Sequence, residues 1–346
     1  MSFRLRSCVW EITLACCFSC AYCGSKAGHS REHELTTDEC LYIADQLAAL
    51  GCQRVSLIGG EVFMRPDWVQ IAKRLTGYGI KVPIITNGYL FKTDILKQMK
   101  EARIESVAVS VDGTESVHDF YRQAGSYKRA INAIQTVANS GIPVSVTSTL
   151  NAKNVETLDD LYQQLISLPI FAWQLQACSP MGSAAASGLD YCFAFSKVIS
   201  FVKEHILTSP FSIGIADNIG YYSEGEGTLR GNPNGLASFR GCQAGLTAIG
   251  IDSVGNVRGC ESMYDDTFIE GNLRDRTLKD IWEDSRSFAY NRQFRFNQLT
   301  GSCASCRYGL YCAGGCRSYN YFVHGKLYES PYCVRREQAG TKSTVV

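Results

Sequence analysis

Cysteines at short, regular intervals constrain this chain more than any other feature of its sequence. Ten of its sixteen cysteines form two sets. The first set is Cys16, Cys20 and Cys23; the second is Cys242, Cys260, Cys303, Cys306, Cys312, Cys316 and Cys333. Thiolates at such intervals can surround one metal ion or cluster, because each short loop returns the chain to the same point. Since an iron–sulfur cluster normally takes four thiolates, the first set would leave one iron uncovered.

The rest of the composition limits the class of protein. With 346 residues and 45% hydrophobic content, the chain is long enough for two units, or for one large barrel with an appendage. Its formal net charge is +1 and it has no basic block, so we expect no nucleic-acid partner. It has neither a signal peptide nor an apolar run of about eighteen residues, so we expect no membrane span and a cytoplasmic location. In that reducing compartment, clustered cysteines indicate metal binding or catalysis rather than disulfides.

Short apolar runs alternate with helical patterns in the first part of the chain. Strands are predicted over residues 9–14, 54–58, 81–86, 106–111, 144–150 and 171–177. Helices are predicted over residues 37–50, 67–78, 93–101, 127–139, 155–167 and 191–207. This alternation predicts an α/β fold whose parallel strands curl into a partial, TIM-like (β/α)6 barrel. Thr36 and Glu39 predict a capping box at the first helix, and Gly51, Gly79 and Gly141 predict left-handed helix ends.

The sequence changes character after about residue 210. Gly, Asn and Tyr are common over residues 214–241, and cysteines dominate from Cys242 onward. We therefore predict a barrel domain over residues 1–210 and a bridging segment over residues 211–241. A cysteine-rich domain over residues 242–346 would follow, and it would depend on bound metal clusters for its stability.

The first cysteine set directly follows the first predicted strand, at the end where barrel enzymes carry their chemistry. A structural zinc site or three unrelated buried cysteines are the alternatives, but zinc prefers four ligands and no fourth one lies at a suitable spacing. The spacing Cys-x3-Cys-x2-Cys, with Tyr22 before the last cysteine, resembles the signature of the radical SAM superfamily. The resemblance implies a [4Fe–4S] cluster whose bare iron binds S-adenosylmethionine, and cleavage of that cofactor to a 5′-deoxyadenosyl radical. Tyr22 is then expected in the cofactor site.

Three further strand ends carry short motifs that match the same family in the same order. Their residues are Gly59, Gly60, Glu61, Asn87, Ser110 and Asp112. The glycine pair and the glutamate resemble the family's GGE motif, in which the glycines would let backbone approach the cofactor and the glutamate would accept from its ammonium group. Asn87 belongs to the motif that ends the third strand, and Ser110 and Asp112 are placed like family residues that contact the ribose and methionine ends. A glycine turn with a surface glutamate, and an ordinary Asp-Gly turn, are the alternatives.

The second cysteine set, with Gly255 in place, resembles the SPASM extension of this superfamily. The resemblance implies two auxiliary [4Fe–4S] clusters, and so three clusters in all. Cys303, Cys306, Cys312 and Cys333 would hold the outer one, and Cys242, Cys260 and Cys316 the inner one. Many relatives have an eighth cysteine just before the first of these, but residues 235–241 contain none, and Cys178 and Cys192 lie far upstream. The inner cluster is therefore expected to have an open iron or a non-cysteine ligand. Paired zinc ribbons would explain only part of this spacing.

SPASM proteins mostly modify peptides, so the resemblance implies a precursor peptide as substrate and a flavodoxin or ferredoxin as electron donor. The motifs most resemble maturases of ribosomally made peptides that join an aromatic ring to a Cβ carbon in a cyclophane. Glu261 follows Cys260 at the position where anaerobic sulfatase-maturating relatives have an aspartate base, and we predict that Glu261 is the catalytic base. A salt-bridged surface glutamate is the alternative for that residue. Formylglycine formation on a sulfatase, peptide epimerisation, thioether synthesis and simple electron transfer are the alternative functions.

Overall fold

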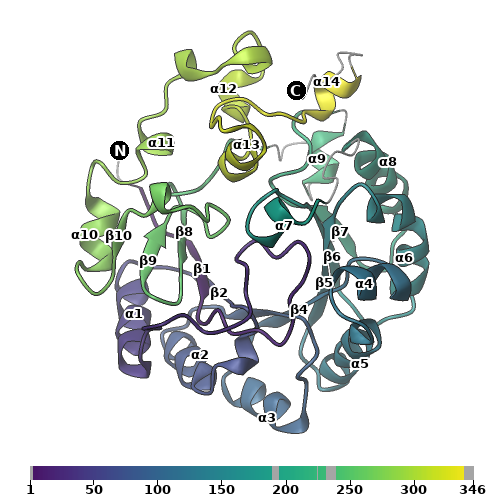
Figure 1. Ribbon diagram of the computed structural model, residues 1–346, viewed down its shortest axis with the longest axis vertical. Helices are drawn as coiled ribbons and strands as arrows, with labels where there is room; N and C mark the ends of the chain where they lie inside the picture. The colour runs from purple at the N-terminus through teal and green to yellow at the C-terminus, as the bar shows by residue number, and fades with distance from the viewer. Residues whose placement is uncertain (1–2, 189–194, 224, 231–238, 339–346) are drawn as a thin grey trace.

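One open, curled sheet organises the molecule (Figure 1). The computed structural model describes residues 3–188, 195–223, 225–230 and 239–338. Within them the strand order is β10-β9-β8-β1-β2-β3-β4-β5-β6-β7, so that β7 and β10 are the two edges. The strands are β1 (Ser7–Glu11), β2 (Arg54–Ile58), β3 (Pro83–Thr86), β4 (Ser106–Ser110), β5 (Val144–Leu150), β6 (Ala172–Ala177), β7 (Ser212–Ile215), β8 (Ala248–Ile251), β9 (Asn256–Arg258) and β10 (Gly271–Asn272). Strands β1 to β8 are parallel, and β9 pairs antiparallel with both β8 and β10.

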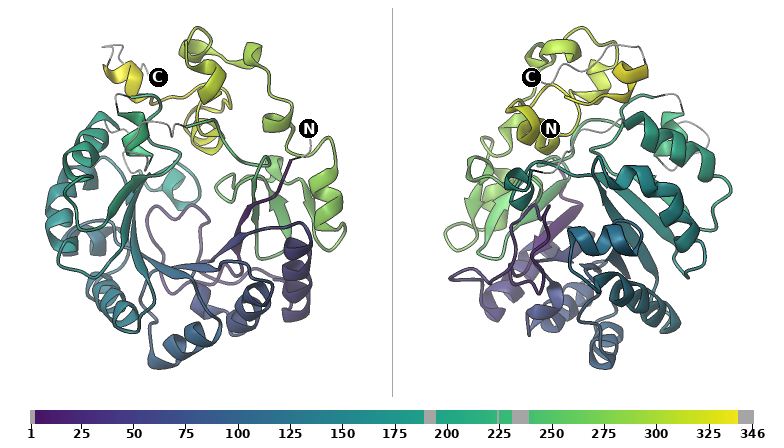
Figure 2. Two further views of the ribbon diagram at one scale, coloured as in Figure 1. Left: turned by 180° about the vertical axis from the view of Figure 1, so that it is seen from behind. Right: turned by 45° about the vertical axis from the view of Figure 1, so that its right-hand side comes forward.

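Helices cover the outer side of the parallel strands (Figure 2). The helices of the first part are α1 (Thr37–Ala49), α2 (Trp68–Gly77), α3 (Thr93–Glu101), α4 (Glu115–Tyr121), α5 (Ser126–Asn139), α6 (Leu158–Leu165), α7 (Ser183–Ala186), α8 (Phe195–His205) and α9 (Glu226–Leu229). Those of the cysteine-rich part are α10 (Leu278–Glu283), α11 (Ala289–Arg292), α12 (Gly309–Cys312), α13 (Arg317–His324) and α14 (Val334–Gln338). None of the helices in the described segments combines the length and the apolar character that crossing a bilayer requires.

The α/β fold and its open barrel confirm the prediction from sequence, as do the local signals. The Thr36 hydroxyl accepts from the Glu39 amide and the Glu39 carboxylate accepts from the Thr36 amide, which is the predicted capping box. Gly51, Gly79 and Gly141 all have positive φ, as expected for residues that end helices. The six-unit barrel prediction was incomplete, because the parallel strands continue with β7 and β8. Strand β7 was missed because its four residues lie in a segment whose Gly and Tyr content indicated only a bridge.

The cysteine-rich part adds its strands to the barrel sheet instead of forming a sheet of its own. Strand β8 pairs with β1, with Ser7 opposite Ala248 and Trp10 opposite Ile251. At the other edge, the Glu337 carboxylate of α14 accepts from the first amides of α8, at 3.2 and 2.9 Å. The C-terminal helices therefore span the gap between the two ends of the open sheet (Figure 1). The predicted domain boundaries stay a prediction.

Candidate active site and iron–sulfur sites

The first cysteine set lies on a closed loop that leaves the end of β1. Ala15 and Gly28 form an isolated bridge, and the Cys16 amide donates to the Gly28 carbonyl at 2.9 Å, so the loop begins and ends at the same place. Backbone amides point at two of the sulfurs: Phe18 N lies 3.4 Å from Cys16 Sγ, and Ala27 N lies 3.3 Å from Cys23 Sγ. Such N–H donors stabilise thiolates. The loop therefore has the donors and the closure that a cluster on three thiolates requires.

The glycine pair after β2 lets two backbone segments touch. A Cβ on Gly60 would lie 2.6 Å from the carbonyl carbon of Ala15 and still closer to the carbonyl oxygens of Leu14 and Ala15. A Cβ on Gly59 would lie 2.7 Å from the Thr13 oxygen. The glycines were expected to make room for a ligand; in the structure they make room for the backbone that leads into Cys16. Their packing fixes where the first cysteine set starts.

Glu61 is 1% exposed, so the alternative of a surface glutamate is wrong. Its carboxylate accepts from the Thr86 hydroxyl at 2.7 Å and from the Asn87 amide at 2.9 Å. Burial raises its pKa to about 7, although these two hydrogen bonds act in the opposite direction. The Asn87 side-chain amide in turn lies 3.9 Å from Cys16 Sγ and 3.5 Å from Cys17 Sγ. The two predicted cofactor residues thus connect the ends of β2 and β3 to the cysteine loop.

Asp112 is the centre of a buried polar cluster beside the same loop. Its carboxylate accepts from the Tyr22 hydroxyl, from Arg122 and from the Thr149 amide. Burial opposes its ionisation, but the charge and hydrogen bond of Arg122 outweigh that effect and lower its pKa. The structure therefore brings the predicted Tyr22 and Asp112 into direct contact, while Ser110 lies half-buried at the end of β4.

Sequence reasoning missed Arg122, which follows α4 and lies near Cys20. Burial raises the pKa of the Cys20 thiol to about 11, and the Arg122 charge opposes that rise. The only signal for Arg122 was an arginine ten positions after the Asp-Gly pair of the fourth strand end. A buried cation here favours thiolate at the loop and an anionic group on any ligand that binds beside it.

The four cysteines predicted for the outer cluster line one cavity. Its volume is about 340 Å³ including the open space at its mouth, and its lining also contains Tyr222, Tyr308 and Arg335. Burial and the other three thiols raise the pKa of Cys312. A hollow enclosed by four thiols is the geometry that a [4Fe–4S] cluster needs. Among the described residues, no three Cys, His, Asp or Glu side chains converge on one point as a single metal ion would require.

The three cysteines predicted for the inner cluster also come together. Burial and Cys242 raise the pKa of Cys260 to about 12, and burial with both of these thiols raises that of Cys316. Cys178 is not part of this group, because it is buried in the barrel beside Tyr22. Cys192 lies outside the described residues. The inner set therefore has three thiols among the residues that can be placed.

Glu261 comes directly after Cys260 and lies near Glu11 and Arg31, which flank the first loop. A Cβ on Gly250 of β8 would lie 2.9 Å from the carbonyl carbon of Cys260 and closer still to the backbone of Glu261. The backbone of Cys260 and Glu261 can therefore pack against β8 only because this position is glycine. Protein atoms surround the Glu261 side chain densely, although part of it stays accessible. Burial, followed by the nearby Glu11 charge, raises its pKa to about 7. Within the described part of the chain, no hydrogen bond or ion pair to its carboxylate is formed. It is thus a base without a salt bridge.

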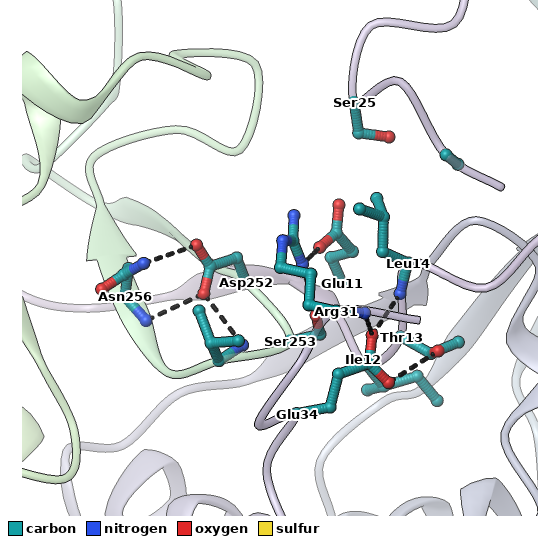
Figure 3. Close-up of polar contacts among 12 residues, drawn as sticks. Glu11, Ile12, Thr13, Leu14, Ser25, Arg31, Glu34, Asp252, Ser253 and Asn256 are labelled. Carbon is teal, nitrogen blue, oxygen red and sulfur yellow. Dashed lines mark hydrogen bonds and ion pairs between the residues drawn. The ribbon is translucent and has the colours of Figure 1, made fainter. Parts of the chain in front are cut away.

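Arg31 joins the first loop to the cysteine-rich part (Figure 3). Its guanidinium donates to Glu11 at the end of β1 and to the Ser253 hydroxyl just after β8. Glu11 is fully buried, and Arg31 is 21% exposed. The Tyr264 hydroxyl donates to the other oxygen of Glu11 at 3.2 Å. Sequence reasoning missed this group, because its members are separated by more than two hundred positions.

Glu34 secures the same loop a few residues later (Figure 3). Its carboxylate accepts from the Thr13 hydroxyl at 2.9 Å, from the Leu14 amide at 2.7 Å and from the Arg31 amide at 3.1 Å. The first cysteine set is therefore held at both ends: by the Gly60 contact before it, and by Glu34 and Arg31 after it.

Known proteins share these features. A family model described as the radical SAM superfamily matches residues 10–165, and a SPASM model, described as an iron–sulfur cluster-binding domain, matches residues 242–307. The AdoMet-dependent heme synthase of Methanosarcina barkeri is 28% identical over 339 residues, which are 94% of this chain and 95% of that protein. The mycofactocin maturase MftC of Mycobacterium tuberculosis is 28% identical over 323 residues, which are 91% of this chain and 78% of that protein.

Solved structures share the fold. SuiB of Streptococcus suis bound to S-adenosylmethionine has a TM-score of 0.76 at 18% identity, over 96% of this chain and 76% of that one. The enzyme anSMEcpe with bound AdoMet has a TM-score of 0.71 at 17% identity, over 96% of this chain and 95% of that one. The first family match contains the whole first cysteine set, and the second contains Cys242, Cys260, Cys303 and Cys306 of the second set. Residues 10–165 of the chain are therefore a region of the radical SAM superfamily, and residues 242–307 are a SPASM iron–sulfur region.

Proposed function

We propose that the protein is a peptide maturase that joins an aromatic ring carbon to a Cβ carbon of a ribosomally made precursor peptide. The observation that carries the proposal is the pairing of a three-thiol loop with the partly accessible carboxylate of Glu261, which has no salt bridge among the described residues and lies near Glu11 and Arg31. The names of the relatives MftC and SuiB support a peptide substrate, since the first is a maturase and the second has been solved with its precursor peptide.

The proposed cofactors are S-adenosylmethionine and three [4Fe–4S] clusters. Bound to a cluster on Cys16, Cys20 and Cys23, S-adenosylmethionine would supply a 5′-deoxyadenosyl radical that removes a hydrogen atom from Cβ. The protein's own residues arrange the reactants. Asn87 and the backbone amides of the loop hold the thiolates, and Arg122 offers a cation to the carboxylate of the cofactor. A flavodoxin or ferredoxin would supply the electron.

Closure of the crosslink removes two hydrogens in all, and the second leaves as a proton and an electron. When the Cβ radical adds to the ring, the ring carbon keeps one hydrogen too many. Glu261 is suited to take that proton, because its pKa of about 7 lies near the working pH. The electron would pass to the inner thiol site, which begins one residue away at Cys260.

The test uses anaerobically reconstituted protein with a candidate precursor peptide. Cys16→Ala is expected to abolish 5′-deoxyadenosine formation, whereas the neighbouring Cys17→Ala is expected to retain it. Glu261→Gln is expected to keep deoxyadenosine formation but to lower crosslinked product by roughly 100-fold, the usual cost of losing a general base. Mass spectrometry identifies the crosslink as the loss of two hydrogens. Unchanged deoxyadenosine formation by Cys16→Ala would contradict the assigned site.

A second candidate is a reaction on a heme precursor. It is favoured by the M. barkeri heme synthase, which aligns over nearly its whole length with this chain. Incubation with an iron porphyrin would reveal this activity through the absorption spectrum of heme. The peptide proposal would fail if heme formed while no peptide was modified. Conversion of a sulfatase cysteine to formylglycine would instead appear as the loss of sulfur from the peptide.

A further inference from the structure

The inner cysteine set lacks one ligand. Cys242 and Cys260 pack in one cluster and Cys316 lies near both, but an iron–sulfur cluster normally takes four protein ligands. No cysteine occurs over residues 235–241, and Cys178 is buried elsewhere. If the proposed three clusters form, the inner one therefore needs a different fourth ligand or keeps an open iron.

A buried hydroxyl beside the same thiols is poorly satisfied by the described residues. Tyr290, on α11, packs in one apolar cluster with Cys242 and Cys260. Its hydroxyl oxygen is buried and makes no hydrogen bond of good geometry among the described residues, although the backbone of Gly259 lies close enough to interact with it. That oxygen lies so close to Gly259, the residue before Cys260, that a Cβ on Gly259 would overlap it. A buried hydroxyl without a well-formed hydrogen bond is costly, so the site is incomplete as the protein atoms alone define it.

The short helix α11 is fixed to two of the three segments that carry the inner thiols, those of Cys242 and Cys316. The Asn291 side-chain amide donates to the Cys242 carbonyl at 3.3 Å and to the Ala244 carbonyl at 2.8 Å. Arg317, the residue after Cys316, donates to the Asn291 oxygen at 3.0 Å. These bonds fix the backbone next to Tyr290 to the segments of Cys242 and Cys316.

Two other oxygen-bearing side chains near the inner thiols, Asp217 and Tyr321, interact with other residues. Asp217 is the carboxylate nearest to Cys316, but its side chain is 67% exposed and lies 3.8 Å from the Arg230 guanidinium. The Tyr321 hydroxyl lies 3.3 Å from an oxygen of Asp265, which gives it a partner. Of these three groups, the Tyr290 hydroxyl is the one that is buried and packed in one cluster with Cys242 and Cys260.

We propose that the phenolate oxygen of Tyr290 is the fourth ligand of the inner iron–sulfur cluster. Phenolate is an established protein ligand of iron. In forming the iron–oxygen bond the tyrosine loses its hydroxyl proton to solvent, and no electron is transferred. The ligand closes the inner cluster, so that this cluster accepts electrons but does not bind substrate. The inference rests on the proposed set of clusters and goes beyond it by assigning the missing ligand.

The test uses the full chain with Cys16, Cys20 and Cys23 all replaced by alanine, so that only the second cysteine set binds iron. This parent, loaded with iron-57, is compared with its Tyr290→Phe variant by Mössbauer and EPR spectroscopy, with and without cyanide as a small external ligand. The parent is expected to ignore cyanide and to show a tyrosinate–iron vibration in its resonance Raman spectrum. Tyr290→Phe is expected to bind cyanide and, on mild oxidation, to lose about one iron in four from one cluster, because that iron has no protein ligand.

Two matched variants serve as controls. Tyr328→Phe removes a hydroxyl that donates to the Tyr290 carbonyl at 3.1 Å, and Asp217→Asn removes the competing carboxylate. Both are expected to behave like the parent.

Several outcomes would overturn the inference. Tyr290 is not the ligand if the parent itself binds cyanide. This test needs the parent alone, so it does not depend on whether Tyr290→Phe folds. The same conclusion follows if Tyr290→Phe matches the parent, or if Asp217→Asn alone opens the cluster. A parent that binds only about four irons would instead contradict the proposed pair of auxiliary clusters, and so would be distinguished from a failure of the ligand assignment.

Discussion

Gly60 is the position where a single methyl group should disrupt the first cysteine set. A Cβ there would lie 2.6 Å from the carbonyl carbon of Ala15, whereas carbon atoms in contact are separated by about 3.5 Å or more. The obstructing atoms are backbone and cannot rotate away. The Ala15 carbonyl accepts from the Glu61 amide at 2.8 Å, and the Leu14 carbonyl accepts from the Gly28 amide at 3.1 Å. Gly60→Ala must therefore push the chain before Cys16 outward by about 1 Å.

The cost follows from these contacts. Overpacking by one methyl group destabilises a core by about 1–3 kcal/mol, and weakening one of the two backbone hydrogen bonds adds about 1 kcal/mol. The total destabilisation of about 2–4 kcal/mol is large enough to displace the short loop. Because the strain acts next to Cys16, we expect it to prevent formation of the first cluster and to leave the second cysteine set intact.

The assay is iron and sulfide content after anaerobic reconstitution, together with the EPR change on adding S-adenosylmethionine. Gly60→Ala is expected to bind about four fewer irons than the unmodified protein and to form no 5′-deoxyadenosine. Gly28→Ala is the control, because a Cβ there would meet no atom within 4 Å although Gly28 closes the same loop. A Gly60→Ala protein with full iron content and normal deoxyadenosine formation would refute the packing argument. Equal damage from Gly28→Ala would show that the loop tolerates no change, which would also refute it.

Three further variants test other parts of the site. Gly250→Ala should displace the backbone of Glu261, because a Cβ would overlap it; product should fall while deoxyadenosine formation continues, as measured by chromatography and mass spectrometry. Arg65→Met should lower the free energy of unfolding by about 3–5 kcal/mol, which a lower thermal midpoint would show. The change removes the cation beside the half-buried Asp67 and the donor to the Ile12 and Leu35 carbonyls. Burial, followed by the charge of Arg122, lowers the pKa of His118 to about 4. Between pH 6.5 and 4 the unfolded chain therefore binds more protons than the folded protein. The free energy of unfolding should fall as the pH falls through that window, by up to about 3 kcal/mol. His118→Gln should therefore flatten the fall of the thermal midpoint over this range, and an unchanged slope would contradict the assignment.

Features that depend on residues close in sequence were predictable. The strand ends, the helix caps and the cysteine spacings each depend on a few neighbouring positions, and the structure has them where the sequence indicated. Four thiols of the second set line one cavity, and Cys242 and Cys260 pack beside α11, while their assignment to two clusters stays a prediction. Helix α4 was missed, because its seven residues are too few to show a clear periodic pattern.

Contacts between distant residues were not predictable. Arg31 and Ser253 are 222 positions apart, and Asp112 meets Tyr22 across 90 positions. Nothing in the sequence around either residue indicates its partner. The contact of the glycine pair with the backbone before Cys16 was missed for the same reason, and the predicted approach of these glycines to the cofactor stays a prediction.

The sheet itself explains how two distant cysteine sets can serve one reaction. Because β1 and β8 are adjacent and parallel, their carboxyl ends meet at the same edge, with the first loop leaving one strand and the segment toward Cys260 following the other. Arg31 crosses this junction and holds the loop to Ser253 (Figure 3). The position of Glu261 relative to the first loop is therefore set by strand register and by the return of the chain through β9, rather than by the docking of a separate domain. The proposed base is thus positioned by the sheet itself, and the pairing of β1 with β8 crosses the predicted division near residue 210.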